Sequence, residues 1–233
     1  MKAIVLAGGL GTRLRGRIAD LPKPMAPIGG RPFLEYLLDR LVNAGVAGIT
    51  LSVGYQAATI QNHFGTQYRG VPIDYAIETE PLGTGGALAH AARNMGPDPV
   101  LALNGDTLLQ IDIAALAAWY AQAPETLAMV LRQVPDAGRY GAIKIDNDRV
   151  VKFEERGLAA PGLINGGIYI FRPEIFQQLG LTDKFSFEVD VLQKHVQQLQ
   201  PRAYVTDAYF IDIGIPEDLD RANLELPALG CPT

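Results

Sequence analysis

The chain has 233 residues, of which 48% are hydrophobic and 19% are charged, with 25 glycines and 16 prolines. This composition excludes a disordered tail and a coiled coil, and it predicts a loop-rich globule large enough to bury a sizeable core. A formal net charge of −5 excludes the general basic field that nucleic-acid binding needs, so a phosphate ligand must be bound by a local cluster of cations.

The N-terminus resembles the start of a secretion signal, because residues 1–7 contain a lysine followed by a short apolar run. The run stops at Gly8, so we interpret it as a buried first strand over residues 3–6. No stretch of about 20 apolar residues occurs, which argues against a membrane span. The only cysteine, Cys231, excludes an internal disulfide, and we expect a cytoplasmic protein.

Short apolar runs alternate with segments of helical spacing through the first half, as in βαβ units around a mostly parallel sheet. The third strand alternates apolar and polar residues and delivers Glu78 at its end, and the fourth is followed by Asn104-Gly105-Asp106. The elements predicted after the first strand are a helix over residues 33–42 that closes at Gly45, strands over 49–53 and 71–77, a helix over 87–95 and a strand over 99–103.

The second half has the pattern of a more antiparallel lobe. An alanine-rich helix over residues 113–121 comes first, and Pro216 begins the last helix. The other predicted elements are strands over 127–134, 142–145, 150–154 and 163–171, helices over 174–179 and 187–199, and a hairpin formed by 204–205 and 209–213. We expect one α/β unit with two lobes, the first for a nucleotide-type ligand and the second for specificity.

A glycine-rich loop, residues 8–13, directly follows the first strand and would let backbone amides approach phosphate oxygens. It lacks the third glycine of the dinucleotide fingerprint, where Leu14 stands, and the Lys-Ser/Thr ending of a P-loop. A tight turn without a ligand is the alternative. Arg13, and Lys23 between two prolines, bring two cations to this loop, so we favour a phosphate ligand.

Further short motifs follow in a fixed order along nearly the whole chain. They occupy residues 6–14, 21–27, 80–86, 104–106, 165–169 and 210–214. In this order the sequence resembles the sugar-phosphate nucleotidyltransferases, and residues 21–27, 32–36 and 78–86 are most similar to the D-glycero-D-manno-heptose 1-phosphate guanylyltransferases.

The resemblance implies a Rossmann-like, GT-A-type fold with a mixed, mostly parallel sheet flanked by helices and a smaller antiparallel sugar-binding lobe. We expect a single domain over residues 1–233. The nucleotide-binding lobe would cover 1–110, the sugar-phosphate lobe 111–225, and a tail 226–233.

The reaction that the resemblance implies joins a nucleoside triphosphate and a sugar 1-phosphate and releases pyrophosphate. A phosphate monoester is already mostly dianionic at neutral pH, so it needs a cation more than a general base. Two acidic residues at strand ends, Asp106 and Asp212, suit Mg²⁺, although turn-forming aspartates are the alternative. The resemblance assigns both to Mg²⁺, and it gives catalytic roles to Arg13, Lys23 and Asp106.

For the nucleotide, the resemblance points to the glycine loop and to glycines near residue 84 that would let a flat base lie against the chain. The carboxylate of Glu78 could accept the paired donors of guanine, which favours GTP, although an exposed strand residue is the alternative. The expected nucleotide-binding residues are Leu6, Ala7, Gly8, Gly9, Gly11, Thr12, Glu78, Gly83, Thr84 and Gly85.

The sugar-phosphate site departs from the family at one position. The family usually has Lys-Pro after Phe-x-Glu, whereas here Arg156-Gly157 follows, so either Arg156 or Lys152 would anchor the phosphate. The sugar-phosphate-binding residues that the resemblance implies are Tyr140, Gly141, Glu155, Arg156, Asn165, Gly166 and Glu188.

Three other functions stay open at this point. Two keep the chemistry: transfer from GTP to mannose 1-phosphate, or from UTP to an amino-sugar or N-acetylmuramate 1-phosphate. The third is a catalytically silent nucleotide-sugar sensor. The joint presence of Arg13, Lys23, Asp106 and Asp212 argues against it. We expect neither a nucleic-acid nor a membrane partner, and the sequence leaves the oligomeric state open.

Overall fold

The computed structural model describes residues 1–9, 11, 14, 17–18, 21–157 and 159–229. Three residues that the sequence analysis singled out, Thr12, Arg13 and Cys231, lie outside these ranges.

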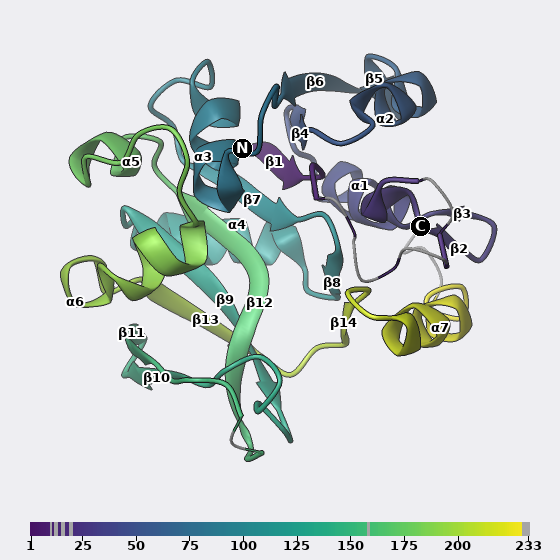
Figure 1. The fold of residues 1–233 in the computed structure, drawn as a ribbon. Helices are drawn as coiled ribbons and strands as arrows, with labels where there is room; N and C mark the ends of the chain where they lie inside the picture. Colours follow the sequence, from purple (N-terminus) through teal and green to yellow (C-terminus); the bar gives the residue numbers. More distant parts are fainter. Residues whose placement is uncertain (10, 12–13, 15–16, 19–20, 158, 230–233) are drawn as a thin grey trace.

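A ten-stranded mixed sheet runs through the described part of the molecule (Figure 1). The strands pair in the order β10 (Ile143–Asp146), β11 (Arg149–Phe153), β13 (Arg202–Thr206), β9 (Leu127–Val134), β12 (Gly162–Phe171), β7 (Val100–Asn104), β1 (Lys2–Leu6), β4 (Ile49–Val53), β6 (Val71–Ile77) and β5 (Gln67–Tyr68). The mixed α/β class expected from the sequence is confirmed.

The first half supplies the parallel part of this sheet. β1 pairs in parallel with β7 and β4, and β4 pairs in parallel with β6. The carboxyl ends of these four strands therefore meet at one edge of the sheet, which is where ligands bind in open α/β sheets. Gly8, Glu78 and Asp106 all lie within two residues of these ends.

The second half is mostly antiparallel. β12 pairs antiparallel with both β7 and β9, and its register against β9 shifts between Asn165 and Tyr169. Such a bulge re-aims side chains within a strand. Two short sheets lie beside the large one: β8 (Thr107–Leu109) with β14 (Phe210–Asp212), and β2 (Pro27–Ile28) with β3 (Arg31–Pro32).

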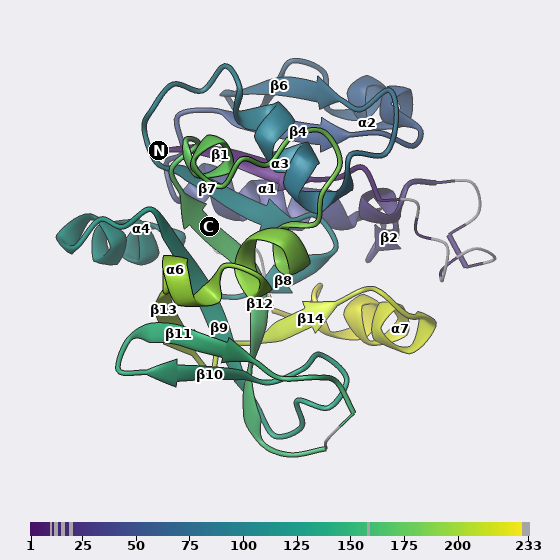
Figure 2. The same ribbon diagram turned by 60° about the vertical axis from the view of Figure 1, so that its left-hand side comes forward.

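Alternating strand residues contribute to two hydrophobic cores, and helices lie on both faces of the sheet (Figure 2). In β1, Ala3 and Val5 belong to one core and Ile4 to the other, as the two-residue period of a strand requires. The first core contains buried residues of α1 (Phe33–Asn43), α2 (Ala57–Phe64), α4 (Ile113–Gln122) and α7 (Pro216–Glu225). The second contains those of α3 (Gly83–Ala92), α5 (Ile175–Gln178) and the π-helix η3 (Phe187–Gln193).

Three predicted elements are wrong in detail. The predicted hairpin does not form, because β13 pairs in parallel with β9 whereas β14 pairs with β8. The helix predicted over 187–199 is interrupted between η3 and α6 (Val196–Leu199). The helix predicted from residue 87 begins at Gly83, so Gly83 and Gly85 lie in its first turn.

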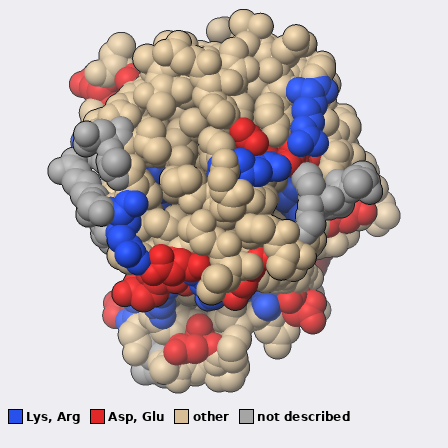
Figure 3. Space-filling view, turned by 90° about the vertical axis from the view of Figure 1, so that its right-hand side faces the viewer, with Lys and Arg blue, Asp and Glu red and all other residues tan. Residues whose placement is uncertain are grey.

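Charges of both signs are mixed on the side of the molecule where β2, β3 and α7 lie in Figure 1. Figure 3 shows blue and red side chains next to one another there, on a mostly tan surface. The ion pair between Arg221 and Glu225 on α7 is one example. Among the described residues, no helix is both long and apolar enough to cross a bilayer.

Candidate active site

Asp106 lies beside the glycine loop because the turn after β7 is tied to the end of β1. The backbone N–H of Gly105 donates to the carbonyl oxygen of Leu6 at 2.9 Å. A Cβ atom on Gly105 would lie 2.3 Å from this oxygen, so the close approach requires glycine. The Asn-Gly-Asp motif therefore brings a carboxylate to the edge where the glycine loop begins.

Lys23 lies between two carboxylates. Its Nζ is 2.5 Å from Oδ2 of Asp106 and 3.6 Å from Oδ1 of Asp212, and only 9% of the Lys23 side chain is exposed. Asp212 arrives on β14, where the N–H of Ile213 donates to the carbonyl oxygen of Asp106 at 3.0 Å. The fold thus brings together three of the residues predicted to act on the triphosphate and the metal.

The two carboxylates form an electrostatically demanding pair. Burial raises the pKa of Asp212 above its ordinary value, the charge of Asp106 raises it further, and the charges of Lys23 and Arg139 oppose both. Oδ1 of Asp212 is buried and accepts no hydrogen bond from the described residues. A divalent cation would offset the repulsion between the two carboxylates and would give Oδ1 of Asp212 a partner. These residues therefore fit Mg²⁺, which prefers hard oxygen ligands.

The described residues contain no group of three or more His, Cys, Asp or Glu side chains that could hold a metal. A magnesium ion on Asp106 and Asp212 would therefore need oxygens from substrate and water. This is the usual arrangement for Mg²⁺ in phosphoryl transfer.

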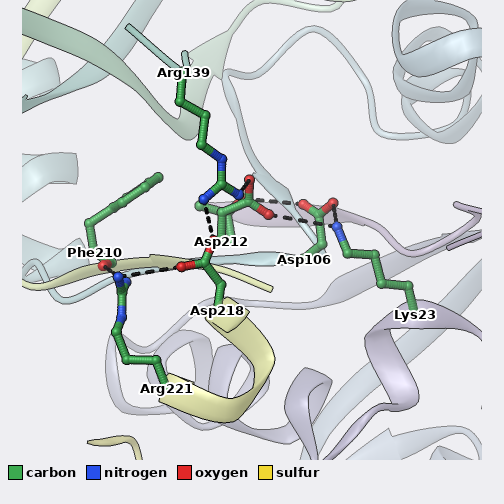
Figure 4. Close-up of polar contacts among 8 residues, drawn as sticks. Lys23, Asp106, Arg139, Phe210, Asp212, Asp218 and Arg221 are labelled. Carbon is green, nitrogen blue, oxygen red and sulfur yellow. Dashed lines mark hydrogen bonds and ion pairs between the residues drawn. The ribbon is translucent and has the colours of Figure 1, made fainter. Parts of the chain in front are cut away.

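The line of charges continues beyond Asp212 to residues that the sequence analysis missed (Figure 4). Nη2 of Arg139 is 3.7 Å from Oδ2 of Asp212, and Nη1 of Arg139 donates to Oδ2 of Asp218 on α7. Arg221 pairs with Asp218 at 3.4 Å and donates to the carbonyl oxygen of Phe210 at 3.2 Å. Arg139 could have been noticed as the cation before Tyr140, whereas nothing in the sequence marks Asp218.

The glycine loop contacts the same centre. Gly11 has φ +57°, and a Cβ atom there would lie 3.0 Å from Cβ of Lys23. A Cβ atom on Gly9 would meet no described atom within 4 Å, so the described residues leave its side of the loop open. Leu6 ends β1, and the buried Ala7 donates its N–H to the carbonyl oxygen of Ser52 at 2.7 Å.

Glu78 lies against the start of the glycine loop, where a Cβ atom on Gly8 would be 2.8 Å from its Oε1. Its carboxylate accepts hydrogen bonds from the hydroxyl of Ser52 at 3.3 Å and the backbone N–H of Leu82 at 3.2 Å. The structure therefore places Glu78 next to the expected nucleotide site and also gives it a part in holding the turn before α3.

Packing also requires glycine at positions 83 and 85, a reason that the sequence did not suggest. Cβ atoms on them would lie 2.5 Å and 2.3 Å from atoms of Phe185. The N–H groups of Gly85 and Gly86 both donate to the carbonyl oxygen of Phe185, at 3.0 and 3.2 Å. The first turn of α3 is thus capped by the segment before η3, and this close approach requires glycine at both positions.

Thr84 joins the two expected ligand sites. Its hydroxyl donates to Oε2 of Glu188 at 2.6 Å and accepts the N–H of Phe187 at 2.9 Å. Ser186 also donates to Oε2 of Glu188, at 3.2 Å. A residue predicted for the nucleotide and one predicted for the sugar are therefore in direct contact.

Asn165 lies at the β12 bulge and faces a tyrosine that the site prediction omitted. Nδ2 of Asn165 donates to the hydroxyl of Tyr169 at 2.7 Å, and its Oδ1 accepts the N–H of Gly167 at 3.0 Å. Burial raises the pKa of Tyr169 well above its ordinary value, and the charge of Glu188 adds to this. Gly166 is closed in, since a Cβ atom would lie 2.9 Å from Leu109 and 3.0 Å from the carbonyl oxygen of Val130.

The remaining sugar-site candidates lie in the second half of the chain, before β10 and after β11. The ring of Tyr140 packs edge-to-face on Phe210, with centroids 5.7 Å apart. Gly141 has φ +85°, and a Cβ atom there would lie 3.6 Å from Cγ of Arg156. Glu155 and Arg156 are both exposed.

Comparison with known proteins agrees with this geometry. A family model described as Nucleotidyl transferase matches residues 2–228. The chain is 43% identical over 226 residues to D-glycero-alpha-D-manno-heptose 1-phosphate guanylyltransferase of Aneurinibacillus thermoaerophilus, covering 97% of this chain and 98% of that protein. It is 34% identical to mannose-1-phosphate guanylyltransferase of Mycobacterium tuberculosis, covering 96% of this chain and 64% of that protein.

A solved structure also superposes closely. The crystal structure of HddC from Yersinia pseudotuberculosis complexed with GMP-PN has a TM-score of 0.84 and 38% identity, covering 97% of this chain and 99% of the other.

Proposed function

Because this chain belongs to the nucleotidyl transferase family, we propose that it transfers GMP from GTP to D-glycero-α-D-manno-heptose 1-phosphate in a Mg²⁺-assisted reaction. The observation that carries the chemistry is the placement of Lys23 between Asp106 and Asp212 at the carboxyl edge of the sheet. A nucleoside triphosphate substrate also accords with the cytoplasmic location that we expect.

Full-length similarity to a heptose 1-phosphate guanylyltransferase supports the choice of substrates. The similarity to HddC solved with GMP-PN supports a guanine nucleotide. Glu78 lies at the expected base site, where its carboxylate would accept the N1–H and N2–H₂ donors of guanine.

In the proposed reaction an oxygen of the sugar 1-phosphate attacks the α-phosphorus of GTP. A new P–O bond forms as the bond from the α-phosphorus to the bridging oxygen breaks, and pyrophosphate leaves with that oxygen. The attacking monoester is mostly dianionic at neutral pH, so no side chain needs to remove a proton. The task of the site is to bring two polyanions together in line.

Asp106 and Asp212 would hold the Mg²⁺, which when bound neutralises charge on the triphosphate. Lys23 would contact the triphosphate and stabilise the charge that builds on the leaving pyrophosphate, because its ammonium is paired with Asp106 and its side chain is largely shielded from water. We assign the same task to Arg13, which lies outside the described residues.

The test is release of pyrophosphate in the presence of Mg²⁺. GTP, UTP, ATP and dTTP would each be combined with D-glycero-α-D-manno-heptose 1-phosphate, mannose 1-phosphate, glucose 1-phosphate and N-acetylmuramate 1-phosphate. We expect the highest kcat/KM for GTP with the heptose phosphate.

A higher kcat/KM for mannose 1-phosphate would favour the second relative's reaction instead, although this chain covers only 64% of that relative. Nucleotide binding without pyrophosphate release from any pair would favour a nucleotide-sugar sensor.

A further inference from the structure

Arg139 occupies a defined position in the loop between β9 and β10. Oδ1 of Asp136 accepts the N–H of Gly138 at 2.8 Å, and the carbonyl oxygen of Gly138 accepts the N–H of Gly157 at 2.8 Å. These contacts tie the loop to the segment after β11. Arg139 therefore sits on an ordered turn directly before Tyr140.

The buried carboxylate of Asp218 binds the guanidinium of Arg139. Oδ2 of Asp218 accepts a hydrogen bond from Nη1 of Arg139, and the Asp218 side chain is only 10% exposed. A guanidinium carries five N–H donors, and Nη2 lies 3.7 Å from Asp212, beyond hydrogen-bonding distance. The Arg139 side chain is 38% exposed. Its Nη1 is bound by Asp218, and other N–H groups of the guanidinium can donate hydrogen bonds to a ligand.

Arg139 neighbours both Asp212, one of the two carboxylates assigned to the metal, and Tyr140, a residue expected at the sugar. Nη2 of Arg139 is 3.7 Å from Oδ2 of Asp212 (Figure 4), and the centroid of the Tyr140 ring is 5.1 Å from Cζ of Arg139. A sugar 1-phosphate must place its phosphate near the metal carboxylates and its hydroxyls at the sugar lobe. The phosphate would therefore lie in the zone that Arg139 borders.

A dianionic phosphate in that zone would be repelled by Asp106 and Asp212. A placed cation offsets this repulsion, and the planar fork of an arginine matches phosphate oxygens in geometry as well as charge. The alternatives are less well placed: Lys152 has a 67% exposed side chain and pairs with Glu154 at 3.8 Å. In the described part of the chain, neither Lys152 nor Arg156 pairs with Asp106 or Asp212.

From these contacts we propose that Arg139, anchored by Asp218, binds the phosphate of the sugar 1-phosphate. The assignment rests on the proposed function and adds to it a residue for the second substrate. It predicts that loss of Arg139 weakens binding of the sugar phosphate and leaves binding of the nucleotide unchanged.

The experiment compares the wild type with Arg139→Gln, Arg139→Lys and the control Arg149→Gln. Arg149 is matched in exposure, 35%, and in pairing with a carboxylate, 2.5 Å from Glu125, but it lies away from the carboxylate pair. Initial rates would be measured with D-glycero-α-D-manno-heptose 1-phosphate varied at saturating GTP, and then with GTP varied. Calorimetry would measure binding of the same sugar phosphate to the enzyme with a nonhydrolysable GTP analogue.

We expect Arg139→Gln to raise the KM and the dissociation constant for the sugar phosphate at least tenfold, with the KM for GTP unchanged within twofold. Arg139→Lys should recover part of the loss, and Arg149→Gln should behave as the wild type. Asp218→Asn should give a smaller rise, because Arg139 loses its anchor; a melting curve would check that this buried substitution leaves the protein folded.

An Arg139→Gln variant that binds the sugar phosphate as the wild type does, with or without a lower melting temperature, would overturn the assignment and leave Arg139 as a link to α7. A fall in kcat alone, with both KM values unchanged, would overturn it as well and point to an effect on Asp212. Failure of the proposed function is distinct, because the wild type itself would then release no pyrophosphate.

Discussion

The ammonium of Lys23 lies 2.5 Å from Oδ2 of Asp106, a carboxylate that we also assign to Mg²⁺. Two cations cannot approach one carboxylate oxygen closely without repulsion, which is strong in a partly buried site. Lys23 and a metal ion should therefore compete for Asp106 until the triphosphate arrives. The incoming phosphate oxygens would then offer Lys23 another partner.

Replacement of Lys23 by Met should separate its competition with the metal for Asp106 from its contact with the triphosphate. We expect the nucleotide-free variant to bind Mn²⁺, used as a paramagnetic substitute for Mg²⁺, more tightly than the wild type. Its kcat should fall by about 10²- to 10³-fold, the usual cost of removing one placed group that stabilises transition-state charge. Lys144→Met, at an exposed lysine on β10, is the control, and unchanged or weaker Mn²⁺ binding by Lys23→Met would contradict the competition.

The raised pKa of Asp212 predicts that this residue reduces stability at neutral pH. Burial and the charge of Asp106 favour its protonated form in the folded state, so the folded protein binds more protons than the unfolded chain between the ordinary pKa and the raised one. The contribution of Asp212 to the free energy of unfolding is therefore highest below the ordinary pKa and falls as pH rises through that window.

Asp212→Asn should accordingly be at least as stable as the wild type at pH 7 while losing its activity. Denaturant unfolding at pH 7 and at pH 4 would measure this, and the stability difference between variant and wild type should shrink at the lower pH. Isothermal titration with Mn²⁺ would show weaker binding. A clear loss of stability at pH 7 would mean that the pairing with Lys23 and Arg139 outweighs burial.

The first half of the fold could be predicted because its strands are short apolar runs separated by clear turns. The second half could not be predicted as well, because the pairing partner of a strand is not encoded near it. Only three residues separate β13 from β14, as in a hairpin, but β13 completes a parallel pair with β9. The hydroxyl of Thr206 accepts the N–H of Ala208 at 3.1 Å, and the chain turns there toward β8.

The candidate site likewise contains residues that local motifs mark and residues whose contacts depend on distant parts of the chain. Lys23, Asp106 and Asp212 stand in local motifs that mark their chemistry. Arg139 and Asp218 act through each other across distant parts of the chain, and neither stands in a motif of its own. Gly83 packs against the backbone of Phe185 and Gly85 against its ring, and these contacts could not be predicted from local sequence because Phe185 is about 100 residues away.

Glu78 offers a test of base selection. Its carboxylate accepts hydrogen bonds from Leu82 and Ser52, and a glutamine can keep only one acceptor oxygen. We expect Glu78→Gln to lower kcat/KM for GTP by about tenfold, which corresponds to about 1.4 kcal/mol and is close to the lower end of the range for a hydrogen bond to a charged group. The value for UTP should change much less, and Glu80→Gln, at an exposed neighbour, should change neither. Equal losses for GTP and UTP would assign Glu78 to the turn alone.

The contact between Thr84 and Glu188 predicts a link between stability and sugar binding. Valine has the shape of threonine but would leave the N–H of Phe187 without its acceptor and Glu188 without its 2.6 Å donor. Thr84→Val should therefore lower the free energy of unfolding by about 1–3 kcal/mol. Because Glu188 is expected at the sugar hydroxyls, the KM for the sugar phosphate should rise as well.

Thr84→Ser is the matched control, since it keeps the hydroxyl and should retain most of both properties. Denaturant unfolding and initial rates on the same preparations would give the two quantities for each variant. If Thr84→Val lost stability but kept the wild-type KM for the sugar phosphate, Glu188 would serve to fix η3 against α3 and would not touch the sugar. If neither quantity changed, water would have to replace the hydroxyl at both partners, and the contact would hold neither the fold nor the site.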